Sequence, residues 1–107
     1  MAGAKIVVLY PRPKDIEAFD RIYHDEHVPM VGEKMSHKTK VVISKVVASP
    51  QGEPPFHLVV ELYYKSMADL QASAGSAGGK ETVDHAHEIS TGGAPIFLIT
   101  EEETLTF

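Results

Sequence analysis

The segment Phe19–Met30, FDRIYHDEHVPM, carries two of the six histidines of the chain, two aromatic residues and a proline. Residues three or four positions apart lie on the same face of a helix. Read at this spacing, one stripe contains Ile16, Phe19, Tyr23 and His27, with His24 on its shoulder. A histidine within an apolar stripe faces whatever the helix packs against. The segment therefore predicts an amphipathic helix with a candidate pocket residue, although a hydrogen-bonded core histidine would show the same pattern.

Two residues set the expected ends of this helix. Asp15 precedes it and is a suitable N-cap, because its carboxylate can accept a hydrogen bond from a backbone N–H of the first turn. Pro29 lacks a backbone N–H and disfavours helical geometry at Val28. We expect the helix to end near His27, with a short turn through Met35 beyond a kink.

Strand patterns flank the helix. Residues 4–10, AKIVVLY, form a continuous apolar run typical of a buried strand, which Pro11 and Pro13 should end. Residues 38–49 are rich in Val and Ile, and 49–55 form a turn cluster. Residues 56–64, FHLVVELYY, alternate, so the even-numbered residues from Phe56 to Tyr64 should share one face and His57, Val59, Glu61 and Tyr63 the other.

The second half of the chain again shows helix patterns followed by a strand pattern. Ser66 is a candidate N-cap for a helix with Met67, Leu70 and Ala74 inward. Glycines at 75–79 should break it, residues 80–90 should form further helical turns with Val83, Ala86 and Ile89 on one side, and residues 94–101 should form the last strand. The order βαββαβ predicts an α+β, ferredoxin-like fold: a four-stranded antiparallel sheet with the helices on one face.

This arrangement leaves the other face of the sheet bare. Because several strands carry Val, Leu or Tyr on both faces, that face would expose a large apolar patch, which usually marks an interface. Symmetric pairing of two sheets would bury it. We therefore expect a homodimer formed through the sheet face, with Leu105 and Phe107 of the C-terminal tail crossing to the partner.

Composition limits the function classes. A chain of 107 residues indicates one domain, 1–107, and 43% hydrophobic residues indicate a folded one. The net charge of −5, with scattered basic residues, argues against nucleic-acid binding. Apolar runs are too short for a membrane span or a secretory signal, and there are no cysteines. We expect a cytoplasmic protein without membrane or nucleic-acid partners.

The first third of the chain resembles the EthD family. The resemblance rests on a first strand that ends in Tyr10-Pro-Arg-Pro13 and on the later run Phe19…Tyr23-His24-Asp-Glu-His27-Val-Pro29-Met30. It implies membership of the dimeric α+β barrel superfamily. The EthD family is grouped with oxidoreductases and catabolic accessory proteins, and relatives on this fold act on small, often aromatic compounds without a cofactor. Their ligands lie between the sheet and the helices.

The site follows from the helical stripe together with this resemblance. His27 is the expected acid or base, because imidazole titrates near neutrality, and a place at a helix C-terminus would favour its protonated form. Tyr23 lies one turn earlier and can stabilise a developing oxyanion. Both would otherwise be ordinary core residues. The resemblance implies that Phe19, His24, Tyr10 and Met30 contact the substrate.

Metal and cofactor patterns are weak. His24 and His27 have a spacing compatible with shared coordination, but Asp25 and Glu26 should point away from the stripe. Nothing in the sequence selects a third ligand among His57, His85 and His87. The glycine-rich segment 75–81 has one residue too few for a phosphate-binding loop, and no dinucleotide fingerprint is present. We expect neither a metal nor a cofactor.

Two functions fit these features. One is a cofactor-independent enzyme acting on a small hydrophobic carbonyl or aromatic compound, by acid/base or oxidoreductase-type chemistry. The other is a non-catalytic protein that binds such a compound or assists an oxygenase or degradation system. An orienting partner on one nitrogen of His27, with the other nitrogen free, would favour catalysis. A purely structural assembly subunit, a third possibility, would have no ligand-sized cavity.

Overall fold

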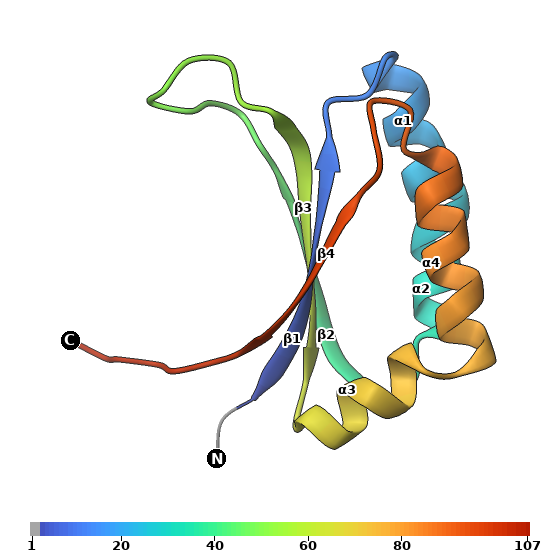
Figure 1. Ribbon diagram of the computed structural model, residues 1–107, viewed down its shortest axis with the longest axis vertical. Coiled ribbons are helices and arrows are strands. Elements are labelled where there is room, and N and C mark those ends of the chain that lie inside the picture. The colour runs from blue at the N-terminus through green and yellow to red at the C-terminus, as the bar shows by residue number, and fades with distance from the viewer. Residues whose placement is uncertain (1–2) are drawn as a thin grey trace.

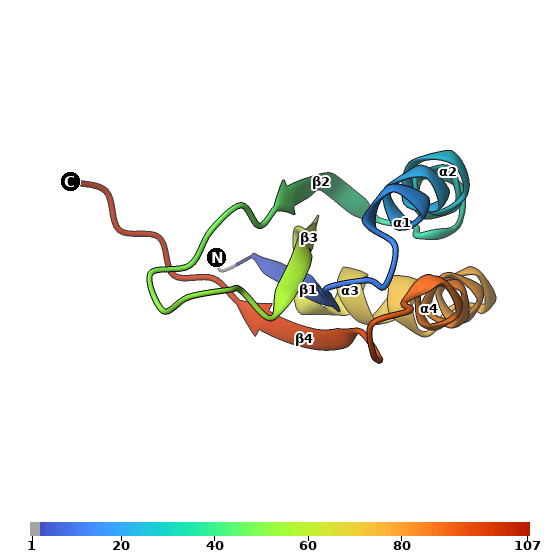
Figure 2. The same ribbon diagram turned by 90° about the horizontal axis from the view of Figure 1, so that it is seen from above.

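The computed structural model describes residues 3–107. Its elements are, in chain order, β1 (Ala4–Pro11), α1 (Ile16–Ile22), the π-helix η1 (Tyr23–His27), α2 (Val28–Lys34), β2 (Lys38–Lys45), β3 (Phe56–Tyr64), α3 (Met67–Ala74), α4 (Ala77–Ile89) and β4 (Ile96–Glu101). The strands form one antiparallel sheet in the order β2-β3-β1-β4. All helices lie on one side of the sheet (Figures 1 and 2). The expected ferredoxin-like α+β fold is confirmed.

The alternation of side chains along the strands determines which strand residues enter the core. In β1 the even-numbered residues from Ala4 to Tyr10 are buried against the helices, and in β3 the even-numbered residues from Leu58 to Tyr64 are buried beside them. The β1–β3 register skips His57, since Tyr10 pairs with Leu58 and Pro11 with Phe56. This bulge turns His57 to the helix side, where its Nε2 lies 2.8 Å from Asp20 Oδ1. The expectation that His57 shares a face with Val59 is wrong for this reason.

Helices α1, η1 and α2 follow one another without a break as far as Lys34, so the expected end near His27 is wrong. Asp15 caps α1 as expected, its Oδ1 accepting from Ala18 N–H at 3.0 Å. In η1 the Val28 N–H donates to the Tyr23 carbonyl, five residues earlier. A proline clashes with the carbonyl four residues before it and cannot donate. We attribute the wider π-turn to Pro29, because an extra residue in the turn relieves that clash.

The start of α4 lies against the end of α2. Ser76 caps α4, so the glycine break is shorter than expected and Gly78 belongs to the first helical turn. A Cβ at Gly78 would lie 2.6 Å from the Lys34 carbonyl oxygen, so glycine is what permits this approach. Lys34 and Glu81 form an ion pair across the same contact. The close approach of the two helices sets the position of every α4 residue relative to η1.

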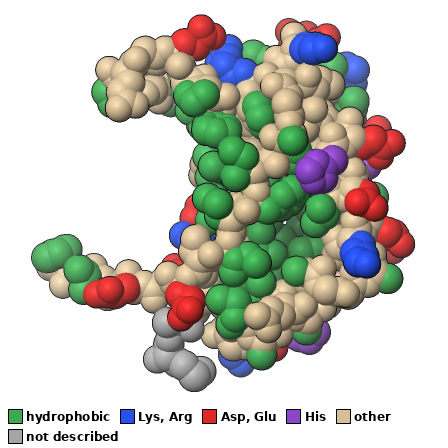
Figure 3. All heavy atoms as spheres, in the orientation of Figure 1, with side chains coloured by type: hydrophobic (Ala, Val, Ile, Leu, Met, Phe, Trp, Pro, Cys, Tyr) green, Lys and Arg blue, Asp and Glu red, His purple; other side chains and the backbone are tan. Residues whose placement is uncertain are grey.

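Within residues 3–107, no helix or strand covers the sheet face opposite the helices (Figure 2). Its apolar residues, assigned from the strand register, include Val7, Leu9, Val42, Val59, Tyr63, Ile96 and Leu98. Lys5 and Glu61 form an ion pair among them at 2.7 Å. Hydrophobic side chains follow the hollow between the β2–β3 loop and the C-terminal tail (Figure 3). The tail extends away from the sheet (Figure 1) and leaves Leu105 and Phe107 exposed.

Within residues 3–107, no helix is both long and apolar enough to cross a membrane.

Candidate functional site

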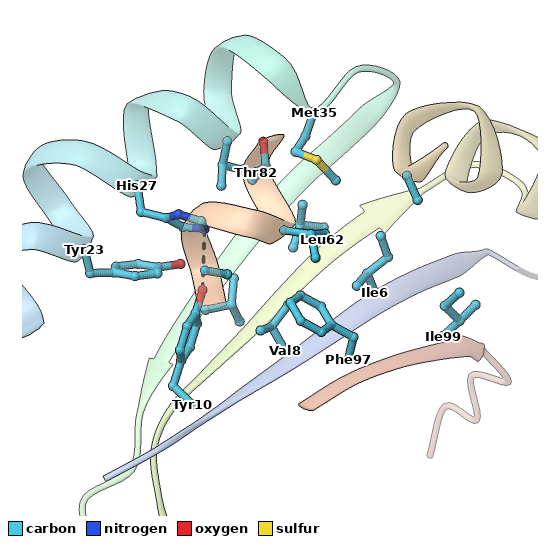
Figure 4. Close-up of a pocket in the computed structure, with 15 residues that line it drawn as sticks. Ile6, Val8, Tyr10, Tyr23, His27, Met35, Leu62, Thr82, Phe97 and Ile99 are labelled. Atoms are coloured by element: carbon cyan, nitrogen blue, oxygen red, sulfur yellow. Dashed lines mark hydrogen bonds between the residues drawn. The ribbon is translucent and has the colours of Figure 1, made fainter. Parts of the chain in front are cut away.

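A cavity of about 300 Å³ lies between the sheet and the helices. This volume is at the lower end of the range for small-molecule sites. Most of its wall is aliphatic or aromatic. The hydroxyls of Tyr10 and Tyr23 and the ring of His27 gather at one end (Figure 4), while the Thr82 hydroxyl donates to the Gly78 carbonyl at 2.7 Å. Its lining consists of Ile6, Val8, Tyr10, Tyr23, His27, Val31, Met35, Val60, Leu62, Ala74, Thr82, Val83, Ala86, Phe97 and Ile99.

Tyr10 and His27 meet at the polar end. The Tyr10 hydroxyl, at the end of β1, lies 3.4 Å from Nε2 of His27 in η1. Tyr23 borders the same space. Phe19 supports both phenols from behind: its ring makes an edge contact with Tyr10 at 5.3 Å and stacks on Tyr23 at 5.9 Å. The three groups that face the cavity are therefore held by a packed aromatic cluster.

The other nitrogen of His27 points to α4. Its Nδ1 lies 2.9 Å from Nδ1 of His85. The ring centroids are 5.2 Å apart and the planes differ by 10°. Because the nitrogens are so much closer than the centroids, the imidazoles meet edge to edge, as an N–H···N hydrogen bond requires. On its far side, His85 Nε2 lies 3.6 Å from Glu26 Oε1. Glu26 thus turns toward α4 rather than away from the site, contrary to expectation.

Burial determines the protonation of these groups. Burial, with a smaller contribution from the neighbouring His85, lowers the pKa of His27 from 6.5 to about 4. His27 is consequently neutral at pH 7. The expected shift toward the protonated form is wrong, because the helix does not end at this residue and burial shifts the pKa in the opposite direction. Burial raises the pKa of Tyr10 and of Tyr23. Both phenols stay protonated, so the site combines one neutral base with two hydrogen-bond donors.

The six residues expected at the site fall into two groups. Tyr10, Tyr23 and His27 line the cavity. Phe19 lies behind them in the core, His24 is exposed, and Met30 is half-buried outside the lining. The histidine His85 was not singled out from the sequence. The burial of Thr82, Ala86 and Ile89 on α4 shows the signal that would have found it, since a stripe at this spacing also contains position 85.

Potential metal ligands do not gather in the described chain. Among residues 3–107, no group of three or more His, Asp or Glu side chains is placed to hold a metal ion. His24 and His27 diverge, because His24 is exposed while His27 is buried. His57 is paired with Asp20, away from the cavity.

Comparison with known families decides the classification. The EthD domain family matches residues 12–89, well beyond the motif in the first third of the sequence. The chain belongs to the EthD family. A crystal structure of an EthD family protein from Bacillus halodurans is 30% identical, with a TM-score of 0.86, covering 96% of this chain and 100% of that one.

Two further proteins are similar to this chain, one in sequence and one in fold. An uncharacterised 11.0 kDa protein from the thcB–thcC intergenic region of Rhodococcus erythropolis is 28% identical over 101 residues, which is 94% of this chain and 96% of that protein. A ferredoxin-like protein of unknown function from Bacteroides fragilis, described as dimeric, is 13% identical, with a TM-score of 0.64 and coverage of 94% and 96%. The latter likeness concerns the fold alone.

Proposed function

We propose that this EthD family protein catalyses proton transfer on a small hydrophobic compound that carries a carbonyl or phenol group. One observation carries the proposal: Nε2 of a buried, neutral His27 faces a ligand-sized cavity beside the hydroxyl of Tyr10. A neutral imidazole is a competent general base, and phenols that remain protonated can stabilise the oxyanion that forms. Tyr23, whose hydroxyl borders the cavity, supplies a second donor.

His27, Tyr10 and Tyr23 together define the proton-transfer step. His27 Nε2 removes a proton from an activated C–H or O–H of the substrate. The electron pair of the broken bond remains on the substrate as an enolate or phenolate, and its oxygen accepts hydrogen bonds from Tyr10 and Tyr23. Return of the proton to a different atom gives isomerisation. The same anion is the electron-rich form that dioxygen oxidises, so the proposal includes both the isomerase and the oxidoreductase classes.

The shape of the cavity supports the substrate class. Apolar side chains such as Ile6, Phe97 and Ile99 line the end away from His27. A molecule with one polar end and an apolar body would place its oxygen at the tyrosines and its body among these side chains. The alternative, a non-catalytic binding or accessory protein, uses the same cavity. It is favoured by the largely apolar wall and by the partner on each nitrogen of His27, which are His85 at Nδ1 and Tyr10 at Nε2.

Proton exchange into a probe ketone separates the two functions. The protein is incubated with 2-tetralone in D₂O, and deuterium uptake at the α-carbon is followed by NMR. We expect wild-type protein to accelerate exchange and His27→Leu to slow it by roughly 10²-fold or more. His37→Asn is the matched control, because His37 is an exposed residue at φ 65°, which Asn tolerates. Binding of 2-tetralone without any acceleration would overturn catalysis and favour the binding role.

We further propose that the protein is a homodimer joined through the bare sheet face and the C-terminal tail. The apolar face opposite the helices supports this, as do the exposed side chains of Leu105 and Phe107. The dimeric description of the Bacteroides fragilis neighbour agrees with it. The helix-side cavity is lined from the opposite face of the sheet, so each subunit would keep its own site.

A further inference from the structure

We propose that His85, held by Glu26, is a positioning residue that fixes His27 as a base and carries its displaced proton toward solvent. The inference deepens the proposed function and rests on it for the catalytic consequence. Neither residue lines the cavity. They act through His27, along a row of groups that begins at Tyr10 on β1 and ends at the protein surface.

The tautomers of His85 and His27 follow from the position of Glu26 at the surface end of this row. The Glu26 carboxylate lies 3.6 Å from Nε2 of His85, beyond hydrogen-bond distance, and its negative charge favours a proton on that nitrogen rather than on Nδ1. Neutral His85 then has a bare Nδ1. Only one of the two Nδ1 atoms that lie 2.9 Å apart can hold the proton, and it must therefore be that of His27. His27 is left with a bare Nε2, which is the nitrogen that faces Tyr10 and the cavity.

Exposure increases along the same row. His27 is 4% exposed, the side chain of His85 is 13% exposed, and that of Glu26 is 63% exposed. The row thus connects the buried ring of His27 to the protein surface through His85 and Glu26. Tyr10 from β1 and Tyr23 from η1 are the other titratable groups in contact with the His27 ring. The contact of Gly78 with Lys34 and the ion pair of Lys34 with Glu81 hold α4 in place one to two turns away.

The proton transfer is balanced at every atom. When His27 Nε2 takes a proton from the substrate, its Nδ1 proton passes to Nδ1 of His85. The Nε2 proton of His85 passes to Glu26 or to water. His27 ends neutral, with its proton on Nε2. When it gives that proton to another atom of the substrate, the proton on Nδ1 of His85 returns to Nδ1 of His27, and Nε2 of His85 regains a proton from Glu26 or water. The charge that would otherwise build up on a buried imidazolium is moved to the surface, where water stabilises it.

Imidazole ¹⁵N NMR of histidine-labelled protein tests the positioning role without a substrate. In wild-type protein we expect His27 protonated at Nδ1 and bare at Nε2, with a ¹⁵N–¹⁵N coupling across the bond to His85. His85→Leu removes the acceptor, so His27 should shift toward the Nε2-protonated tautomer. His85→Gln offers a carbonyl acceptor and should keep the wild-type tautomer. His87→Gln, an exposed position on the same helix, is the control.

Two results would overturn the inference. One is a wild-type His27 protonated at Nε2, which needs no variant to fold. The other is a His85→Leu protein with an unchanged His27 tautomer. In the 2-tetralone assay, His85→Gln keeps the tautomer but cannot relay a proton, and we expect exchange to slow at least tenfold. An unchanged rate would overturn the relay while leaving the proposed function intact. If wild-type protein showed the tautomer without exchange activity, the proposed function would fail and the positioning role would stand.

Discussion

The hydroxyl of Tyr10 lies 3.4 Å from Nε2 of His27, at the one end of the cavity where polar atoms meet. Tyr10 lies one residue before the end of β1 and His27 is the last residue of η1, so sheet and helix each contribute one of the pair. The rings are nearly perpendicular, at 83°, which leaves the phenol directed at the nitrogen edge. A substrate oxygen entering this end meets a donor and a base together.

Removing the Tyr10 hydroxyl should damage function more than stability. Tyr10→Phe keeps the ring contacts with Phe19 and Tyr23, and we expect a loss of about 1 kcal/mol in unfolding free energy. Exchange of 2-tetralone should fall by roughly 10²-fold, because an oxyanion donor is lost. Tyr64→Phe is the matched control: its hydroxyl bonds to Ser73 at 2.9 Å outside the cavity. A control with an equal loss of exchange would contradict the role of Tyr10.

Stability should depend on pH through His27. Its folded-state pKa, about 4, lies below the ordinary 6.5, so the unfolded chain binds the proton first as the pH falls. The unfolding free energy should therefore decrease between about pH 6.5 and about pH 4, by up to ~3 kcal/mol from this group. Urea denaturation across this range measures the slope. His27→Leu should show a shallower slope, and an identical slope would show that His27 is not the titrating group.

A pair of glycines tests the contact between α2 and α4. Gly78→Ala would place a Cβ 2.6 Å from the Lys34 carbonyl oxygen, and we expect a loss of roughly 1–3 kcal/mol. Gly32→Ala lies in α2 with no atom within 4 Å of the new Cβ in the described chain, and should stabilise by roughly 0.5–1 kcal/mol. Chemical denaturation compares the two. Gly78→Ala should also weaken the His27–His85 coupling in the ¹⁵N spectrum. Equal stability of both variants would contradict this packing.

A charge on the bare sheet face should separate the subunits. Leu98 is 45% exposed on β4 and faces away from the helices. Leu98→Lys would bury a charge in the proposed interface, and sedimentation equilibrium should show a monomer. Gln71→Lys, at an exposed position on α3, is the control and should remain dimeric. A wild-type protein that is monomeric at micromolar concentration would refute the interface.

The tail gives a separate test of the same interface. Deleting residues 104–107 removes Leu105 and Phe107, two apolar side chains that are exposed in one subunit. If both are buried against the partner, the dimer dissociation constant should rise at least roughly 100-fold. Unfolding of the isolated subunit should be unaffected, because neither side chain packs on its own core. An unchanged dissociation constant would exclude the tail from the interface.

The sequence predicts most of the fold because its local signals agree with its packing. The alternation in β3, the Asp15 and Ser66 caps and the stripe through Phe19, Tyr23 and His27 all reappear in the structure. The errors occur where one tertiary contact overrides a local rule. The bulge reverses His57, and the π-turn carries the helix past Pro29.

The site is predictable only in part for a related reason. Tyr10, Tyr23 and His27 come from the segment that carries the family motif. His85 enters through a contact between residues 58 positions apart, which depends on how α4 lies against η1. The spacing within α4 can place His85 on the inward side of the helix, but it does not specify His27 as the partner. The bend of Glu26 toward His85 depends on the same packing.

A crystal structure with 2-naphthol bound tests the central claim, that the protein acts at the polar end of this cavity. We expect the naphthol oxygen within hydrogen-bond distance of His27 Nε2 and the Tyr10 hydroxyl, with the rings toward Phe97 and Ile99. A cavity left empty at saturating naphthol would contradict the account. A separate groove lies between α2 and β2, beside Gly32 and Val41. Naphthol bound only in that groove would also contradict the account.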